Sequence, residues 1–331
     1  MTGTLESPTS QELTPDQLLD AYRTMKTIRD FEERVHDEFA GGDIPGFVHL
    51  YAGEEASAVG VCSHLDDRDA IASTHRGHGH CIAKGVDPVG MMAEIYGKST
   101  GSCRGKGGSM HIADLSKGML GANGIVGGGP PLICGTALAA KLKGTGGVSV
   151  AFFGDGASNQ GTTLESMNLA SVWNLPAIFV AENNGYAEST SSTWSVASDN
   201  IADRAAGFGM PGVIVDGFDF FAVHEAASEA IARAREGGGP TLIEMKFTRY
   251  FGHFEGDQQT YRASEVEHAR AELDCLKRFA DRVTETGELG RPDLDAVDAE
   301  VGALIDRVVG EAKAAPLPTE ADLLTDVYVR Y

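Results

Sequence analysis

Residues 148–156, VSVAFFGDG, join a short apolar run to an aspartate between two glycines, and this stretch decides how the chain folds. The run is rich in valine and phenylalanine, which predicts a buried strand of a parallel sheet. The flanking glycines allow the backbone to turn and to approach a ligand closely. Asp155 is therefore expected at the carboxyl end of a strand, where open α/β sheets bind ligands.

The residues that follow predict a complete βαβ unit. Residues 162–174 predict a crossover helix, and residues 176–184, PAIFVAENN, predict the next strand, which ends at Asn184. Gly-Asp-Gly or Asn-Asn alone is usually a turn or a loop, but this spacing brings a carboxylate and an amide oxygen to one sheet edge. Hard oxygen ligands of this kind suit Mg²⁺ that also holds phosphate oxygens, so we predict a diphosphate and Mg²⁺ site.

Strand and helix patterns alternate along most of the chain, which is typical of an α/β fold with a mostly parallel sheet flanked by helices on both faces. Residues 212–217, GVIVDG, and 241–247, TLIEMKF, predict two more parallel strands around a helix. We expect residues 1–13 to be a disordered tail. Residues 14–331 are expected to form a single large domain with a helical C-terminal region from about residue 264.

Composition narrows the classes of function. A formal charge of −21 without a basic stripe disfavours nucleic acids and anionic membranes as partners. The five cysteines are scattered and form no C-x-x-C motif, so neither a disulfide framework nor a zinc site is indicated. No apolar segment approaches the length of a membrane span. These features predict a cytoplasmic protein.

Two loops are expected to bring cationic and titratable side chains to the predicted site. His75 and Arg76 follow a predicted strand in AIASTHRGHGH, and a guanidinium beside glycine suits contacts with phosphate. The neighbouring histidines lack the helical spacing of a metal site, which argues against a bound transition metal. Arg249 and His253 in TRYFGHFEGD follow another strand. His253 is a candidate proton donor, although a single histidine is more often structural.

Two nucleotide-binding motifs are absent from the glycine-rich segments. The sequence Gly97-Lys98-Ser99 resembles the end of a phosphate-binding loop, but Met92 replaces the first glycine and no apolar strand precedes it. No G-x-G-x-x-G follows a predicted strand, so a nicotinamide-binding fold is not supported. Residues 121–129 are a further stretch where the backbone can approach a cofactor.

With these motifs placed, the chain resembles, from about residue 18 to residue 328, the alpha subunit of the thiamine-diphosphate-dependent component of 2-oxo acid dehydrogenase complexes. The resemblance rests on HLYAGEEA, STHRGHGH, GKGGSMH, ANGIVG, GDGASNQG, ENNGYAEST and FGHFEGD. The sequences NNGYAES and GHFEGD are most similar to the corresponding segments of the acetoin-cleaving members. The resemblance implies cleavage of acetoin to acetaldehyde and a hydroxyethyl unit that is passed to lipoamide as acetyl. Decarboxylation of pyruvate or branched-chain 2-oxo acids is the alternative.

The resemblance also implies the roles of individual residues. Asp155 and Asn184 would ligate Mg²⁺ together with the backbone carbonyl of Tyr186, and His253 would be catalytic as well as cofactor-binding. His75 departs from the tyrosine frequent in pyruvate relatives. Besides His253, the residues implied in binding thiamine diphosphate are His75, Arg76, Gly124, Val126, Gly156, Ala157 and Arg249, together with the metal ligands Asp155 and Asn184.

A partner chain completes the site in this family. The resemblance implies a beta subunit that supplies the glutamate for activation of the cofactor, an α₂β₂ heterotetramer, and a lipoyl-bearing dihydrolipoamide acyltransferase. The chain alone is therefore expected to be inactive. Two other hypotheses remain open at this point, half of a split transketolase and a non-catalytic Mg²⁺-phosphate-binding assembly subunit.

Overall fold

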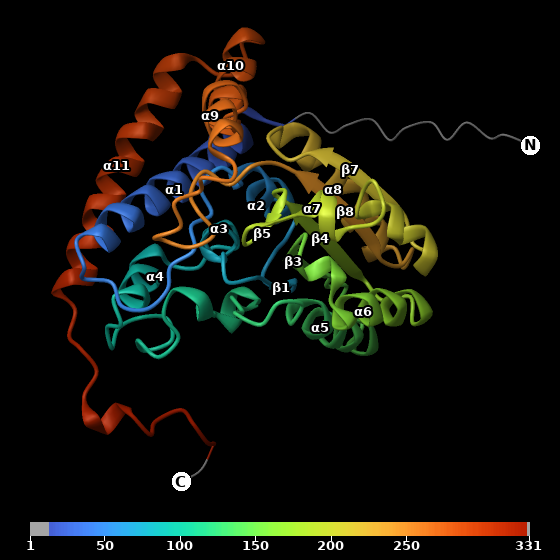
Figure 1. Cartoon of the computed structure of the whole chain (residues 1–331), viewed down its shortest axis with the longest axis horizontal. Helices are drawn as coiled ribbons and strands as arrows, with labels where there is room; N and C mark the ends of the chain where they lie inside the picture. Colours follow the sequence, from blue (N-terminus) through green and yellow to red (C-terminus); the bar gives the residue numbers. More distant parts are fainter. Residues whose placement is uncertain (1–12, 330–331) are drawn as a thin grey trace, which may run out of the picture.

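The computed structural model describes residues 13–329, in which six parallel strands form one sheet in the order β2-β1-β3-β4-β8-β7 (Figure 1). This confirms the predicted α/β class. The tail predicted at residues 1–13 lies, except for its last residue, outside the described part of the chain. The strands are β1 (Ala70–Ala72), β2 (Met119–Gly121), β3 (Ser149–Gly154), β4 (Ala177–Asn183), β7 (Gly212–Asp216) and β8 (Thr241–Lys246), and a separate antiparallel pair is formed by β5 (Tyr186–Ala187) and β6 (Thr190–Ser191).

Helices pack on both faces of this sheet. The predicted βαβ unit is β3-α6-β4, in which β3 and β4 pair in parallel from Ser149 opposite Ala177 to Gly154 opposite Glu182. The α-helices are α1 (Pro15–Ala40), α2 (Glu55–Cys62), α3 (His78–Ala83), α4 (Pro88–Ile95), α5 (Gly129–Lys143), α6 (Gly161–Val172), α7 (Ser192–Ser195), α8 (Phe220–Arg235), α9 (Ala263–Glu272), α10 (Cys275–Glu285) and α11 (Arg291–Ala314), and short 3₁₀ helices are η1 (Ser109–His111), η2 (Leu115–Lys117), η3 (Ala157–Asn159), η4 (Ala202–Phe208) and η5 (Glu320–Asp322).

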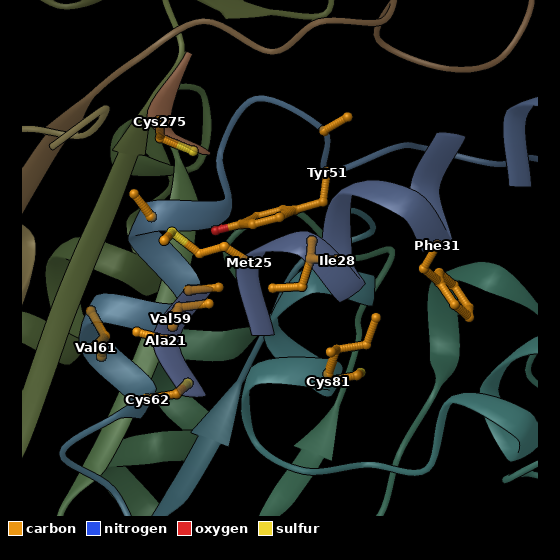
Figure 2. Close-up of a cluster of buried hydrophobic side chains, with 14 of the residues drawn as sticks. Ala21, Met25, Ile28, Phe31, Tyr51, Val59, Val61, Cys62, Cys81 and Cys275 are labelled. Atoms are coloured by element: carbon orange, nitrogen blue, oxygen red, sulfur yellow. The ribbon is translucent and has the colours of Figure 1, made fainter. Parts of the chain in front are cut away.

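The alternation of side chains along β3 divides the core into two clusters. Val150 and Phe152 pack into the larger cluster, which contains the apolar faces of α1, α2, α8, α10 and α11. Ala151 and Phe153 point to the opposite face, where α5 and α6 complete a smaller cluster. Figure 2 shows part of the larger cluster, with Met25 of α1 among its labelled side chains. A strand buried on both faces reads as a continuous apolar run, which is the pattern of residues 148–153.

Within residues 13–329, the structure contains no helix with the combined length and apolar character that crossing a membrane requires.

Arg29 joins three helices inside the larger cluster. Its Nε and Nη2 atoms donate to Glu55 at 2.5 and 2.9 Å, and its Nη1 donates to Asp274 at 2.7 Å. Replacement of Arg29 by Met leaves two mostly buried carboxylates without their cation, so we expect the free energy of unfolding to fall by about 3–5 kcal/mol. Urea unfolding measures this change. Arg23→Met on the same helix removes only surface ion pairs and should cost less than about 1 kcal/mol. Equal effects of the two variants would contradict this role for Arg29.

Candidate functional site

A cavity of about 250 Å³ lies at the carboxyl ends of β3, β4 and β8, where the loops after β1 and β2 also converge. Gly124 is the one implied site residue that does not line this cavity, although its neighbours Asn123 and Ile125 do. The structure therefore brings together the residues that sequence reasoning collected from five separate motifs. The implied residues that line the cavity are His75, Arg76, Val126, Asp155, Gly156, Ala157, Asn184, Tyr186, Arg249 and His253.

Asp155 directly follows β3 and has one carboxylate oxygen free. Its side chain is buried, and Oδ2 has no hydrogen-bond partner. Burial raises the pKa of Asp155 to about 6, because the charged form has lost its hydration. An unpaired carboxylate oxygen in a cavity is costly unless a cation compensates it. This atom therefore fits a metal ligand.

Asn184 and Tyr186, which follow β4, add two carbonyl oxygens. The Asn184 Nδ2 group donates to Glu54 Oε1 at 2.9 Å, which fixes the orientation of the amide. Its Oδ1 and the Tyr186 backbone carbonyl both accept from Nη1 of Arg249, at 3.3 and 2.8 Å. The two oxygens thus face the same point. Together with Asp155 they form an oxygen donor set that fits a hard cation such as Mg²⁺.

Glu54 orients one member of this donor set, the Asn184 amide. It is buried, and burial raises its pKa to about 8. Its replacement by Met removes the acceptor that orients Asn184, so we expect Mg²⁺ affinity in the presence of diphosphate to fall about 10- to 100-fold. Isothermal titration calorimetry measures the affinity. Glu54→Gln retains an acceptor oxygen and should remain within about threefold of the wild type. A Met variant that binds as tightly as the Gln variant would refute this orienting role.

Arg249 is fully buried and nearly saturated with hydrogen bonds. Besides the contacts of Nη1, its Nη2 donates to the Glu188 carbonyl at 3.0 Å and to the Tyr261 hydroxyl at 2.7 Å. Its Nε is buried and has no partner. Arg249 therefore fixes the loop after β4 and has one donor left for an anion in the cavity.

Arg76 connects its own loop to the segments that contain Leu50 and His253. Its Nη1 donates to the Leu50 carbonyl at 2.5 Å, and its Nη2 donates to the His253 carbonyl at 3.0 Å. Burial lowers the pKa of Arg76 to about 10. Because both terminal nitrogens bind backbone, Arg76 holds the segments of Leu50 and His253 against its own loop while its positive charge remains beside the cavity.

The histidines of STHRGHGH separate into two kinds. His78 uses both ring nitrogens, with Glu32 at 2.9 Å and with Ser109 Oγ at 2.9 Å. His80 likewise bonds Ser73 Oγ at 2.7 Å and Glu182 Oε1 at 3.0 Å. Both rings are fully buried and serve the fold. This agrees with the argument against a metal bound by neighbouring histidines of this loop.

His75 instead meets two histidines from other segments. The rings of His49, His75 and His253, here called the histidine cluster, have centroid separations of 4.5 to 5.1 Å. Sequence reasoning missed His49, because its position in HLYAGEEA carries no periodicity that predicts contact with either of the others. It also missed Glu182, which lines the cavity and accepts from Tyr51 at 2.5 Å.

Comparisons with known proteins show the family to which the chain belongs. Residues 23–321 match the family model described as dehydrogenase E1 component. The chain is 69% identical over 320 residues, 96% of both chains, to the alpha subunit of acetoin:2,6-dichlorophenolindophenol oxidoreductase of Cupriavidus necator. Identity to the same subunit of Bacillus subtilis is 59% over 96% of both chains. It is 42% to the pyruvate dehydrogenase E1 component subunit alpha of Zymomonas mobilis, over 95% of this chain and 89% of the relative. The chain belongs to the dehydrogenase E1 component family.

Proposed function

We propose that this chain is the alpha subunit of a thiamine-diphosphate- and Mg²⁺-dependent enzyme that cleaves acetoin and passes the resulting two-carbon unit to lipoamide as acetyl. The observation that carries the choice of substrate is the pattern of identity: 69% and 59% to subunits named for acetoin, against 42% to one named for pyruvate. Decarboxylation of pyruvate or another 2-oxo acid is the second candidate. A purely structural Mg²⁺-phosphate subunit would not explain the cavity-lining His253.

The oxygen donor set described above would hold Mg²⁺, and Arg249 Nε would contact the diphosphate. Packing against Ala187 requires a glycine at position 156, because a Cβ there would lie 2.6 Å from the Cβ of Ala187. Gly156 and Ala157 both line the cavity, and the missing side chain at Gly156 would let the diphosphate approach the backbone. When bound, thiamine diphosphate supplies an electron sink for the broken carbon–carbon bond.

His253 would hold and move a proton at the reacting centre. It lines the cavity, and burial lowers its pKa to about 4, so its imidazole is neutral near pH 7. Its backbone N–H donates to Asp257 at 2.8 Å and its carbonyl accepts from Arg76, so the loop that carries it is fixed at both sides. A neutral imidazole can accept a proton and return it within one catalytic cycle.

The subunit naming of the relatives indicates a beta subunit as partner. An α₂β₂ heterotetramer, a lipoyl-bearing acyltransferase and a cytoplasmic location are parts of this proposal. The five cysteines are free thiols, which supports a reducing compartment.

Product analysis tests the proposed function. The purified alpha and beta subunits should release acetaldehyde from acetoin and reduce 2,6-dichlorophenolindophenol only when thiamine diphosphate and Mg²⁺ are both present. Removal of Mg²⁺ with a chelator should abolish turnover, and added Mg²⁺ should restore it. Release of CO₂ from pyruvate without acetaldehyde from acetoin would favour the second candidate.

A further inference from the structure

Within the described part of the chain, the histidine cluster has ring nitrogens without hydrogen-bond partners, whereas the buried rings of His78 and His80 use both of theirs. One ring nitrogen from each of His49, His75 and His253 lies within 4.8 Å of the other two. No hydrogen bond or ion pair found for residues 13–329 uses a ring nitrogen of these three residues. His49 is 7% exposed, and its Nδ1 is buried without a partner. The cluster therefore has unused donors and acceptors beside the cavity, which His75 and His253 line.

Arg76 fixes the three segments that carry the cluster. It follows His75 in sequence, and its two terminal nitrogens bind the carbonyls of Leu50, next to His49, and of His253. The His49 ring is nearer to that of His75, with centroids 4.5 Å apart, than to that of His253, at 5.1 Å. His49 thus lies against His75 and, unlike His75, is not among the residues that line the cavity.

The charges around the cluster favour neutral imidazoles. Burial, with a further contribution from Arg76, lowers the pKa of His49 to about 3 and that of His75 well below its usual range. The three nitrogens are close enough for a transition metal, but Arg76 and Arg249 make the surroundings unfavourable for another cation. The imidazoles are therefore neutral, and a neutral imidazole has a ring nitrogen with a lone pair that can accept a proton.

The two candidate reactions differ in their need for such an acceptor. Cleavage of a 2-hydroxyketone breaks the bond between its carbonyl and carbinol carbons. The carbinol O–H bond also breaks, and its electron pair forms the carbonyl of the released aldehyde. The carbon–carbon electron pair remains with the two-carbon unit that the cofactor stabilises, and the hydroxyl proton requires a base. Loss of CO₂ from a 2-oxo acid releases no such proton.

We propose that His75, backed by His49, is a catalytic base that accepts the hydroxyl proton of an uncharged 2-hydroxyketone, and that it makes the site selective for this class of substrate. The inference rests on the proposed function and adds a residue to it. The hydrogen bonds of the two arginines favour an uncharged substrate. All terminal nitrogens of Arg76 and Arg249 are bound to protein oxygens. A substrate carboxylate would therefore find no free guanidinium fork.

The test uses the assembled alpha and beta complex with thiamine diphosphate and Mg²⁺. His75→Asn keeps a polar side chain but cannot act as a base, so acetoin turnover should fall about 10²- to 10⁴-fold. Turnover is compared at saturating thiamine diphosphate, and a fluorescence titration with the cofactor establishes both saturation and folding of the variant. The loss of any pyruvate decarboxylation shown by the wild type should be at least about tenfold smaller than the loss of acetoin turnover. Imidazole added to His75→Ala should restore part of the acetoin turnover.

The matched control is His268→Asn, an exposed histidine on α9, which should match the wild type in every measurement. A His75→Asn variant as active as an acetoin-active wild type would refute this inference alone. Equal losses for acetoin and pyruvate, or a transition metal bound by the wild type and lost in the variant, would also refute it. A wild type that processes only 2-oxo acids would refute the proposed function itself.

Discussion

Asp155→Asn is expected to weaken the binding of Mg²⁺ and thiamine diphosphate by about 10³-fold, equivalent to about 4 kcal/mol, and to abolish turnover. The substitution keeps the shape of the side chain but removes the charge of the free oxygen Oδ2. A neutral amide is a much weaker ligand for a hard divalent cation than a carboxylate. Calorimetric titration of the assembled complex measures the loss.

The same substitution should leave the fold intact or stabilise it. Burial raises the pKa of Asp155 to about 6, so its ionisation reduces folding stability progressively above the unfolded pKa of about 4, and the full cost is present above about pH 6. Removal of that charge should therefore keep or raise the melting temperature at pH 7.5 without ligand. This combination, loss of binding with no loss of stability, separates a ligand role from a structural one. Asp67→Asn at the surface is the control and should change neither quantity. A destabilised Asp155→Asn variant with normal affinity would contradict the assignment.

The isolated chain is expected to show less than about 1% of the turnover of the complex with its beta subunit. Four of the described residues with carboxylate side chains line the cavity, Glu54, Asp155, Glu182 and Glu188; Glu54 bonds Asn184, Glu182 bonds Tyr51, and Asp155 is the expected metal ligand. In the proposed function, the glutamate that activates the cofactor comes from the beta subunit. Apolar side chains beside the cavity are also exposed, Ile125 at 72% and Val126 at 51%, as is typical of a surface that a partner covers.

Mixing experiments measure this dependence directly. Addition of purified beta subunit to the alpha chain should restore dye reduction with acetoin, with saturation at one beta per alpha. Beta subunit mixed with the Asp155→Asn chain serves as the control and should remain inactive, which excludes turnover by beta alone. Full turnover by the alpha chain without beta would show that this chain contains the whole site.

The sequence was sufficient for the strands and for the residues at their ends. A buried strand reads as an apolar run, and the residue after it must lie at the sheet edge, so Asp155 and Asn184 could be placed from residues 148–184 alone. His49 could not be placed this way. It lies in the connection between α1 and α2, and its contact with His75 depends on how two loops pack.

The hydrogen-bond partners of Arg76 likewise could not be predicted from the sequence. Its residue type and neighbouring glycine predict a phosphate contact, and the side chain does line the cavity. Its hydrogen bonds to Leu50 and His253 connect residues that are 26 and 177 positions away. No local sequence pattern predicts a contact between a side chain and the backbone of such distant loops. These hydrogen bonds of Arg76 could therefore be identified only from the folded structure.

The ratio of kcat/KM for acetoin to that for pyruvate, measured on the assembled alpha and beta complex, tests the central claim most directly. With thiamine diphosphate and Mg²⁺ present, we expect acetoin to be preferred by at least about 100-fold, because the cavity offers neutral imidazoles and no free guanidinium fork. A ratio in favour of pyruvate would contradict the claim that this site cleaves acetoin.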